Sequence, residues 1–208
     1  ILADISGSID GGTRGVSKRD RITELAAVLA FSAMGNNDKV GAILFSARIE
    51  KFIPPKKGKS HVLRIIREII EIEPEGKGTD ITNALDHFLS AMKKRTVSFL
   101  LSDFRDSGYE DLLKRAGRKH DFVALKIEDP IDIDIPDVGW LPLKDYESGE
   151  TKWMRTGSKK DRIRYRAIEL ERSENLKRAF ARAGIDSATI RTDMPYVKPL
   201  MQLFDRRG

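Results

Sequence analysis

The stretch ILADISGS, residues 1–8, decides the fold. It begins with apolar residues, as in the middle of a buried strand, and polar side chains then alternate with small or apolar ones as the strand turns into a loop. Asp4, Ser6 and Ser8 can therefore direct one carboxylate and two hydroxyls toward a single point above a sheet. Hard oxygen ligands of this kind suit Mg²⁺, with Mn²⁺ or Ca²⁺ as substitutes.

A polar turn would also explain the pattern of Asp4, Ser6 and Ser8. Two further residues favour the metal-binding interpretation. Thr79 lies in the loop GKGTD, residues 76–80, at the start of a helix, and Asp103 follows the buried strand 97–101. Taken alone, Thr79 or Asp80 is a helix cap and Asp103 is a loop carboxylate. A parallel sheet brings the carboxyl ends of its strands to one rim, where ligands bind. We therefore expect Asp4, Ser6, Ser8, Thr79 and Asp103 to gather there.

Apolar runs and amphipathic helical stripes alternate along most of the chain, which predicts an α/β fold with a mostly parallel sheet between two layers of helices. The expected strands are residues 1–4, 40–45, 48–53, 97–101, 122–127 and 185–190. The expected helices are residues 18–34, one capped by Ser60, 81–92, 109–118, 159–183 and one capped by Asp193. Gly184 ends the helix at 159–183.

Two hairpins are predicted. Strands 40–45 and 48–53 are separated by only two residues, and Pro54-Pro55 is expected to end the second strand, which favours a sheet edge. An added hairpin is expected within residues 139–156, on either side of Ser148-Gly149.

The composition sets limits on the class of protein. The chain has 208 residues, 40% of them hydrophobic, and no cysteine, so one globular domain over residues 1–208 is expected, without disulfides or thiolate metal sites. No apolar run reaches membrane-spanning length and no basic, apolar leader opens the chain, so we expect this segment neither to span a membrane nor to carry a signal peptide. It starts in mid-strand without Met, and we interpret it as a fragment lacking its N-terminal part. A cytoplasmic location is expected, with membrane association open for the full-length protein.

The net charge of +6 is uneven. Residues 151–208 contain 15 basic and 7 acidic side chains, and a basic stripe occupies residues 159–166. Such a stripe can contact phosphates or can form a solvated helix face. A nucleic-acid-associated domain using residues 151–208 therefore remains an alternative, although the sequence contains no recognisable nucleic-acid-binding module.

The five candidate ligands, in this order and on these elements, resemble the metal-ion-dependent adhesion site of a von Willebrand factor A domain. The resemblance implies a Rossmann-like three-layer fold with sheet order 3-2-1-4-5-6 and one antiparallel edge strand. It also implies that Ser6, Ser8 and Thr79 hold the metal directly, and that Asp4 and Asp103 hold it directly or through water. A Glu or Asp from a protein partner would then fill the open coordination position.

A narrower resemblance is carried by Ser102-Asp103-Phe104, Asp129-Pro130, residues 143–149 and the C-terminal stretch 196–207. These segments are similar to the bacterial family called domain of unknown function 58. Members of that family are commonly encoded beside MoxR-type AAA+ ATPases. The resemblance therefore implies an adaptor or assembly factor that works with such an ATPase.

Enzyme classes are less well supported by the residues. A haloacid-dehalogenase-type phosphotransferase needs a carboxylate where this chain has Ser6, and the chain contains neither G-x-S-x-G nor G-x-x-x-x-G-K-[ST]. His61, His87 and His120 are scattered without metal-ligand spacing. We expect a protein-binding module and not an enzyme, and a hydrolase that uses the metal to activate water remains an alternative.

Overall fold

Six strands form one sheet in the computed structural model, which describes residues 1–9, 15–144 and 151–207. The sheet order is β3-β2-β1-β4-β5-β8, and every neighbouring pair is parallel except β2 and β3. The strands are β1 Leu2–Asp4, β2 Val40–Phe45, β3 Ile49–Lys56, β4 Val97–Ser102, β5 Asp121–Glu128 and β8 Asp186–Arg191. This confirms the predicted fold class, with β8 as the sixth strand and β3 as the antiparallel edge.

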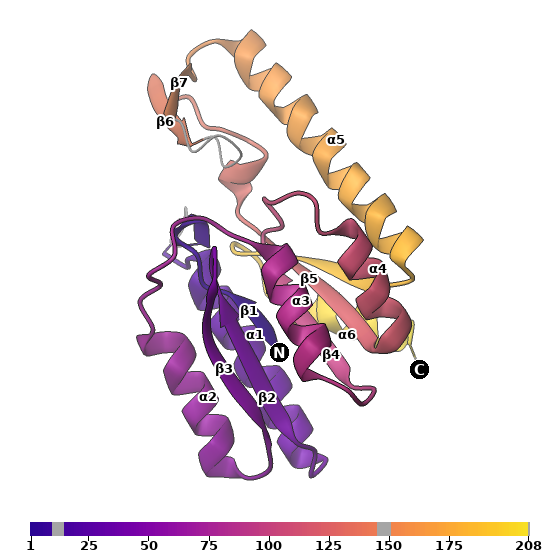
Figure 1. Ribbon diagram of the computed structural model, residues 1–208. Coiled ribbons are helices and arrows are strands. Elements are labelled where there is room, and N and C mark those ends of the chain that lie inside the picture. The colour runs from indigo at the N-terminus through magenta and orange to yellow at the C-terminus, as the bar shows by residue number, and fades with distance from the viewer. Residues whose placement is uncertain (10–14, 145–150, 208) are drawn as a thin grey trace.

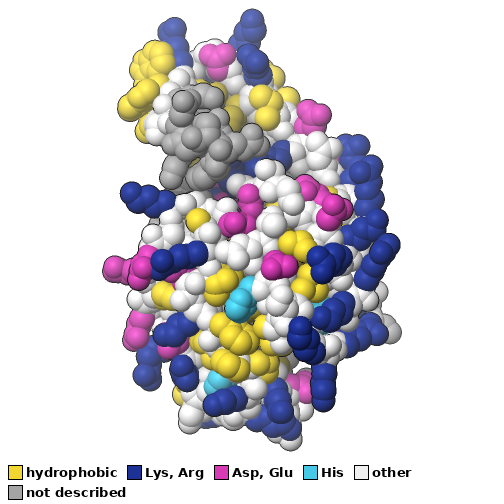
Figure 2. All heavy atoms as spheres, viewed as in Figure 1, with side chains coloured by type: hydrophobic (Ala, Val, Ile, Leu, Met, Phe, Trp, Pro, Cys, Tyr) yellow, Lys and Arg dark blue, Asp and Glu magenta, His cyan; other side chains and the backbone are white. Residues whose placement is uncertain are grey.

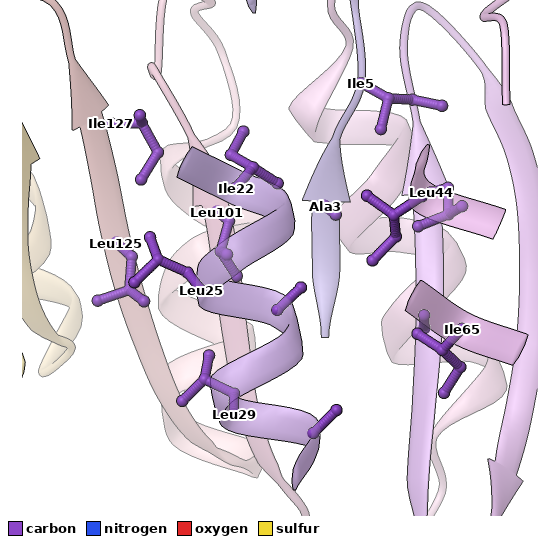
Figure 3. Close-up of a cluster of buried hydrophobic side chains, with 14 of the residues drawn as sticks. Ala3, Ile5, Ile22, Leu25, Leu29, Leu44, Ile65, Leu101, Leu125 and Ile127 are labelled. Carbon is purple, nitrogen blue, oxygen red and sulfur yellow. The ribbon is translucent and has the colours of Figure 1, made fainter. Parts of the chain in front are cut away.

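Successive side chains along the strands point into two separate cores, because strand side chains alternate between faces. Leu2 and Leu100 belong to one core, and Ala3 and Leu101 belong to the other. The second of these cores is covered by α1 Lys18–Gly35, α2 Lys59–Glu71 and α6 Val197–Asp205. Figure 3 shows Leu25 of α1 above the strands of this core.

The opposite face of the sheet is covered by α3 Ile81–Ala91, α4 Glu110–Lys119 and the C-terminal end of α5 Lys159–Ala183. Two layers of helices therefore enclose the sheet (Figure 1). All the parallel strands of this sandwich end at the same rim, which is where the predicted ligands follow β1 and β4.

The ends of the elements agree with the sequence in some places and differ in others. Gly184 has a φ of 66°, and this left-handed backbone ends α5 where expected. The prediction that Pro54-Pro55 ends β3 is wrong, because β3 continues to Lys56. Proline is tolerated there because an edge strand has one side without a hydrogen-bonded neighbour.

Two predicted helix caps are also wrong. α2 begins after Gly58, which makes no side-chain cap, and Ser60 lies inside the helix. α6 begins after Tyr196, and the Asp193 carboxylate instead accepts hydrogen bonds of 2.9 Å from the Arg191 guanidinium.

The strands β6 Trp140–Lys144 and β7 Thr151–Arg155 form a separate two-stranded antiparallel sheet. This pair and the first half of α5 project away from the α/β body, above the rim (Figure 1). The predicted turn at Ser148-Gly149 lies outside the described residues. Among the described helices, none combines the length and the apolar character that a membrane crossing requires.

Candidate metal centre

Asp4 is the last residue of β1, and its carboxylate is fully buried. One carboxylate oxygen, Oδ1, accepts a hydrogen bond of 3.0 Å from the backbone N–H of Ser6. The other, Oδ2, accepts one of 2.6 Å from the Ser102 hydroxyl at the end of β4. The carboxylate is thus fixed in the rim between the ends of two neighbouring parallel strands.

Thr79 reaches this carboxylate site from the loop before α3. Its hydroxyl donates a hydrogen bond of 2.7 Å to the Ser6 hydroxyl. The cap of α3 is Asp80, whose carboxylate accepts a hydrogen bond of 2.7 Å from the Asn83 N–H. The Asp80 N–H donates a hydrogen bond of 2.9 Å to the Ser46 carbonyl. Because Asp80 caps the helix, the Thr79 side chain is available at the rim.

The turn after β4 holds Ser102 and Asp103 in place. Phe104 is a buried non-glycine residue with a φ of 56°, a backbone conformation that such residues rarely adopt. Its N–H donates 3.0 Å to the Ser102 hydroxyl, which in turn donates to Asp4. Strained backbone of this kind persists where the surrounding structure enforces it, and it is frequent at functional sites.

Asp103 is only 4% exposed, and a buried lysine lies against it. The Lys18 ammonium is 3.1 Å from Asp103 Oδ2 and 2.8 Å from Asp132 Oδ2. The other Asp103 oxygen accepts 3.2 Å from the Arg105 N–H. The sequence predicts Lys18 only as the first residue of a helix. The helix dipole disfavours a positive charge in the first turn, so a lysine at this position was a sign that a carboxylate lies nearby.

An ionic network continues from Asp132 to α5. The Arg105 guanidinium lies 3.4 Å from Asp132 and 3.3 Å from Glu169 of α5. The Tyr165 hydroxyl, also on α5, donates 3.2 Å to the Asp132 carbonyl. The rim is therefore connected to the projecting helix through charged and polar contacts, and this connection was not predicted from the sequence.

The electrostatics of the rim follow from burial. Burial raises the pKa of the Asp4 carboxyl to about 7, the Asp103 carboxylate acts in the same direction, and hydrogen bonds from Ser102 and Ser6 oppose the change. Burial lowers the pKa of the Lys18 ammonium, but the Asp103 and Asp132 carboxylates reverse this, so its pKa lies above the ordinary value. The charge of Asp4 is thus incompletely offset by the protein.

The residues present fit a hard divalent cation. Direct hydrogen bonds bring together Asp4, Ser6 and Thr79. The Asp103 carboxylate lies close enough to raise the pKa of Asp4, and Asp103 itself is held by Lys18. The side chain of Ser8 lies outside what the structure describes. Among the described residues, no group of three or more His, Cys, Asp or Glu is placed to hold a metal ion, and the candidate donors at the rim are two carboxylates together with hydroxyls. Oxygen donors of this kind suit Mg²⁺, Mn²⁺ or Ca²⁺.

The other groups considered from the sequence lie elsewhere. His61 Nε2 is 3.0 Å from the carbonyl of Val40, the first residue of β2, and His120 Nδ1 is 3.1 Å from the Thr96 hydroxyl. His87 packs edge-on against Phe52. None of these imidazole contacts involves a predicted metal ligand.

The basic stripe of α5 is partly neutralised. Arg162 lies 3.2 Å from Asp137, and Arg166 lies 3.1 Å from Asp134. These pairs reduce the positive charge that the stripe presents to a phosphate backbone.

Comparison with known proteins places the chain in a family. Residues 1–175 match the family described as protein of unknown function DUF58, and the chain belongs to this family. It is 29% identical over 152 residues to the uncharacterised protein Rv1480 of Mycobacterium tuberculosis, which covers 72% of this chain and 48% of that protein. It is 23% identical over 158 residues to the uncharacterised protein MAV169 of Mycobacterium avium, with 74% and 93% covered. The chain thus spans about half the length of Rv1480.

Solved structures are similar in fold. The conserved hypothetical protein BatB from Bacteroides thetaiotaomicron superimposes with a TM-score of 0.62 at 19% identity, over 99% of this chain and 95% of that one. An aerotolerance-related membrane protein from Bacteroides fragilis gives a TM-score of 0.60 at 18% identity, over 99% and 96%. Proximal thread matrix protein 1 from the mussel byssus, with a zinc-occupied MIDAS motif, gives a TM-score of 0.47 at 19% identity, over 62% and 37%.

Proposed function

We propose that this domain is a metal-ion-dependent protein-binding module, with a MIDAS-type site for Mg²⁺ at the rim. The observation that carries the proposal is the buried convergence of Asp4, Ser6 and Thr79, with the Asp4 charge incompletely offset. A buried carboxylate is unfavourable without a cation or donors to match it. A divalent cation would supply that match.

Asp4, Ser6, Ser8, Thr79 and Asp103 would hold the ion, with Mn²⁺ or Ca²⁺ as substitutes. When bound, Mg²⁺ would offer an incompletely neutralised coordination position to a Glu or Asp carboxylate of a partner protein. Hydrogen bonds hold the Asp4 carboxylate and the Ser6 and Thr79 hydroxyls close together at the rim, which supports this part of the proposal. Asp103 is shared with Lys18, whose positive charge would weaken the attraction of the site for a second cation.

We propose that the partner is a protein, a MoxR-type AAA+ ATPase, and that the domain acts as its adaptor or assembly factor. Membership of the DUF58 family supports this part of the proposal. The full protein would be associated with a membrane, as the name of the Bacteroides fragilis neighbour suggests for that protein. We propose a binding role and not an enzymatic one, because the described contacts of the rim include oxygen donors that would hold a cation and no imidazole that would act as a base.

Calorimetric titration with MgCl₂ and MnCl₂ tests the metal centre. The unmodified domain should bind at one site, and Asp4→Ala and Thr79→Ala should lower the affinity at least about tenfold, because each removes an oxygen donor. Asp38→Ala is the matched control, since Asp38 is an exposed carboxylate in the loop before β2. Absence of binding to both metals, or equal binding by all variants, would overturn the metal centre.

Biolayer interferometry with a MoxR-type ATPase tests the partner. Association in Mg²⁺ should disappear with EDTA and with Asp4→Ala, and it should persist with Asp38→Ala. Association that survives both chelation and Asp4→Ala would contradict a carboxylate bridge through the metal. Salt-sensitive DNA binding that survives chelation would instead favour the nucleic-acid alternative, and phosphate or peptide hydrolysis lost with Asp103→Asn would favour the hydrolase alternative.

A further inference from the structure

A groove separates the β6–β7 pair from the first half of α5. In the antiparallel register Trp140 is opposite Arg155, and Pro142 is opposite Trp153. Opposed residues share a face, and alternate residues along a strand do so too, so both tryptophans and Arg155 lie on one face of the pair. Trp140, Trp153 and Arg155 line a hollow of about 420 Å³.

The other wall of the groove is a stripe of α5. Asp161, Arg164, Tyr165 and Ile168 line it, and their spacing of three, four and seven residues places them on one side of a helix. The first half of α5 therefore presents a mixed aromatic, aliphatic and basic surface instead of packing into a core. Within the described part of α5, the buried side chains are Phe180 and Ala183, both at its far end.

The groove exposes apolar surface that a folded domain ordinarily buries. Trp140 is 62% exposed and Trp153 is 65% exposed, and Ile168 on the opposite wall is also exposed. Figure 2 shows hydrophobic side chains gathered at this projecting end, with Lys and Arg beside them. A contiguous apolar patch with a polar border is typical of an interaction site.

The charge of the groove selects the chemistry of its occupant. Among the described residues, Arg155, Lys159, Lys160 and Arg164 make no ion pair, and Asp161 is the one acidic residue in the described lining. The unpaired cations lie on the β6–β7 pair and on the first turns of α5, whose helix dipole adds positive potential there. An acidic occupant is therefore favoured electrostatically.

We propose that this groove binds a segment of a partner protein in which acidic side chains flank apolar ones. Trp, Tyr and Arg are the side chains that contribute most to protein–protein binding energy when they line a pocket. The lining mixes aromatic rings with the aliphatic side chain of Ile168, which suits the apolar side chains of a peptide. Because the aromatic rings could also stack on bases, single-stranded nucleic acid is tested as an alternative occupant. The proposal stands independently of the metal centre.

Tryptophan fluorescence provides a direct test, because Trp140 and Trp153 are the two tryptophans of the chain and both line the groove. The probe is a Trp-free peptide of about 15 residues, with Glu on one helical face and Leu and Phe on the other, long enough to form a few turns. Its saturable binding should shift the emission to the blue. A matched peptide with Lys at every Glu position should leave the emission unchanged.

Variants locate the binding. Arg155→Glu with Arg164→Glu should weaken the acidic peptide about tenfold or more, and Trp140→Ala should do the same, read from the remaining tryptophan. Arg178→Glu is the matched control, because it reverses an exposed charge farther along α5. All three variants change exposed or half-buried side chains outside the two cores, so circular dichroism should show an unchanged fold.

Several outcomes would overturn the proposal. These are no emission change with the acidic peptide, an equal change with the lysine peptide, or equal weakening by Arg178→Glu. A blue shift produced by phosphatidylglycerol vesicles or by a single-stranded oligonucleotide, with none from the acidic peptide, would assign the groove to a membrane or to nucleic acid instead. Binding that persists in EDTA and in Asp4→Ala is expected, so loss of the metal centre and loss of the groove are distinguishable.

Discussion

The rim of the sheet and the groove beside α5 depart from the usual distribution of side chains in opposite directions. At the rim, Asp4, Lys18 and Asp103 are charged groups that are almost completely buried. At the groove, Trp140 and Trp153 are large apolar groups that remain mostly exposed. Buried polar groups and exposed apolar patches are the informative exceptions to the rule that apolar residues lie inside. The comparison teaches that one domain contains two candidate binding surfaces of different physical origin.

The two surfaces also differ in their support. The rim is built directly on the sheet, whose strands are packed on both faces. The groove is held by the two-stranded sheet and by a helix whose described buried residues lie at its distant end. We therefore expect substitutions at the rim to affect global stability and substitutions at the groove to affect binding alone.

The largest expected effect is that of Lys18→Met. This change leaves Asp103 without its buried cation, while Asp132 keeps its contact with Arg105, and removal of one partner of a buried ion pair costs about 3–5 kcal/mol. Urea unfolding should show this loss, and saturating Mg²⁺ should restore part of it by replacing the missing positive charge.

Lys51→Met is the control for Lys18→Met. Lys51 lies 2.6 Å from Glu68, but its side chain is 39% exposed, and such a pair contributes about 1 kcal/mol or less. Equal losses for the two variants would contradict the view that the rim contains an obligatory buried pair.

The second prediction compares two isoleucines directly. Ile65 of α2 is fully buried and Ile163 of α5 is 59% exposed. Ile65→Ala should lower the free energy of unfolding by about 2–5 kcal/mol, because it leaves a cavity in the core. Ile163→Ala should change it by about 0.5 kcal/mol or less. A large loss for Ile163→Ala, measured in urea, would mean that the first half of α5 belongs to the cooperative core.

A third, smaller effect concerns the contact between the body and α5. A Cβ atom added to Gly117 of α4 would lie 2.7 Å from the Ala183 carbonyl oxygen and 2.9 Å from Ile185 Cγ1. Gly117→Ala should therefore destabilise the protein by about 1–3 kcal/mol through overpacking. Thermal unfolding should show this as a lower midpoint.

Gly35→Ala is the matched control for Gly117→Ala. Nothing lies within 4 Å of a Cβ at Gly35, the last residue of α1. Alanine has the higher helix propensity, so this variant should keep or raise the midpoint. A lower midpoint for Gly35→Ala than for Gly117→Ala would refute the close approach of α4 and α5.

The smallest expected effect is a pH dependence in the body. Burial of His120, which is 2% exposed, lowers the pKa of its imidazole below the ordinary value, and neighbouring Lys119 acts in the same direction. The unfolded chain therefore binds more protons than the folded one as the pH falls below about 6.5, and stability is lost there. Protonation of Asp4, whose raised pKa of about 7 stabilises the folded state as the pH falls, acts equally in both proteins, so the comparison between them isolates the imidazole. Between pH 7.5 and pH 5.5 the change in urea midpoint should be slightly less favourable in the unmodified protein than in His120→Gln. An identical change would mean that His120 makes no contribution.

Local sequence patterns predicted much of the fold. The bounds of β2 and α5 match the structure, because a continuous apolar run and a helical stripe ended by Gly184 are determined by nearby residues. The edge position of β3 was also predicted, but its end was not. Proline stops an inner strand and not an edge strand, so the effect of Pro54-Pro55 depends on which neighbours the strand acquires.

The candidate site was predicted only in part. The convergence of Asp4, Ser6 and Thr79 follows from the ends of parallel strands meeting at one rim. The Lys18 contact with Asp103 was missed, because a lysine at a helix start carries no local mark of the carboxylate that it will meet. The exposed groove was missed as well, since the sequence predicted the hairpin but not which elements would lie against its faces.

The sequence by itself determined the class of the fold, the order of its elements and the bounds of some of them, such as β2 and α5. Those features depend on side-chain periodicity and on glycine and capping chemistry within a few residues. The tertiary structure alone decided that Ser102 donates to Asp4 across 98 positions of sequence and that Lys18 pairs with Asp103 across 85. Burial strengthens the electrostatic attraction within such pairs because the interior has a low dielectric constant, and burial depends on how the whole chain packs.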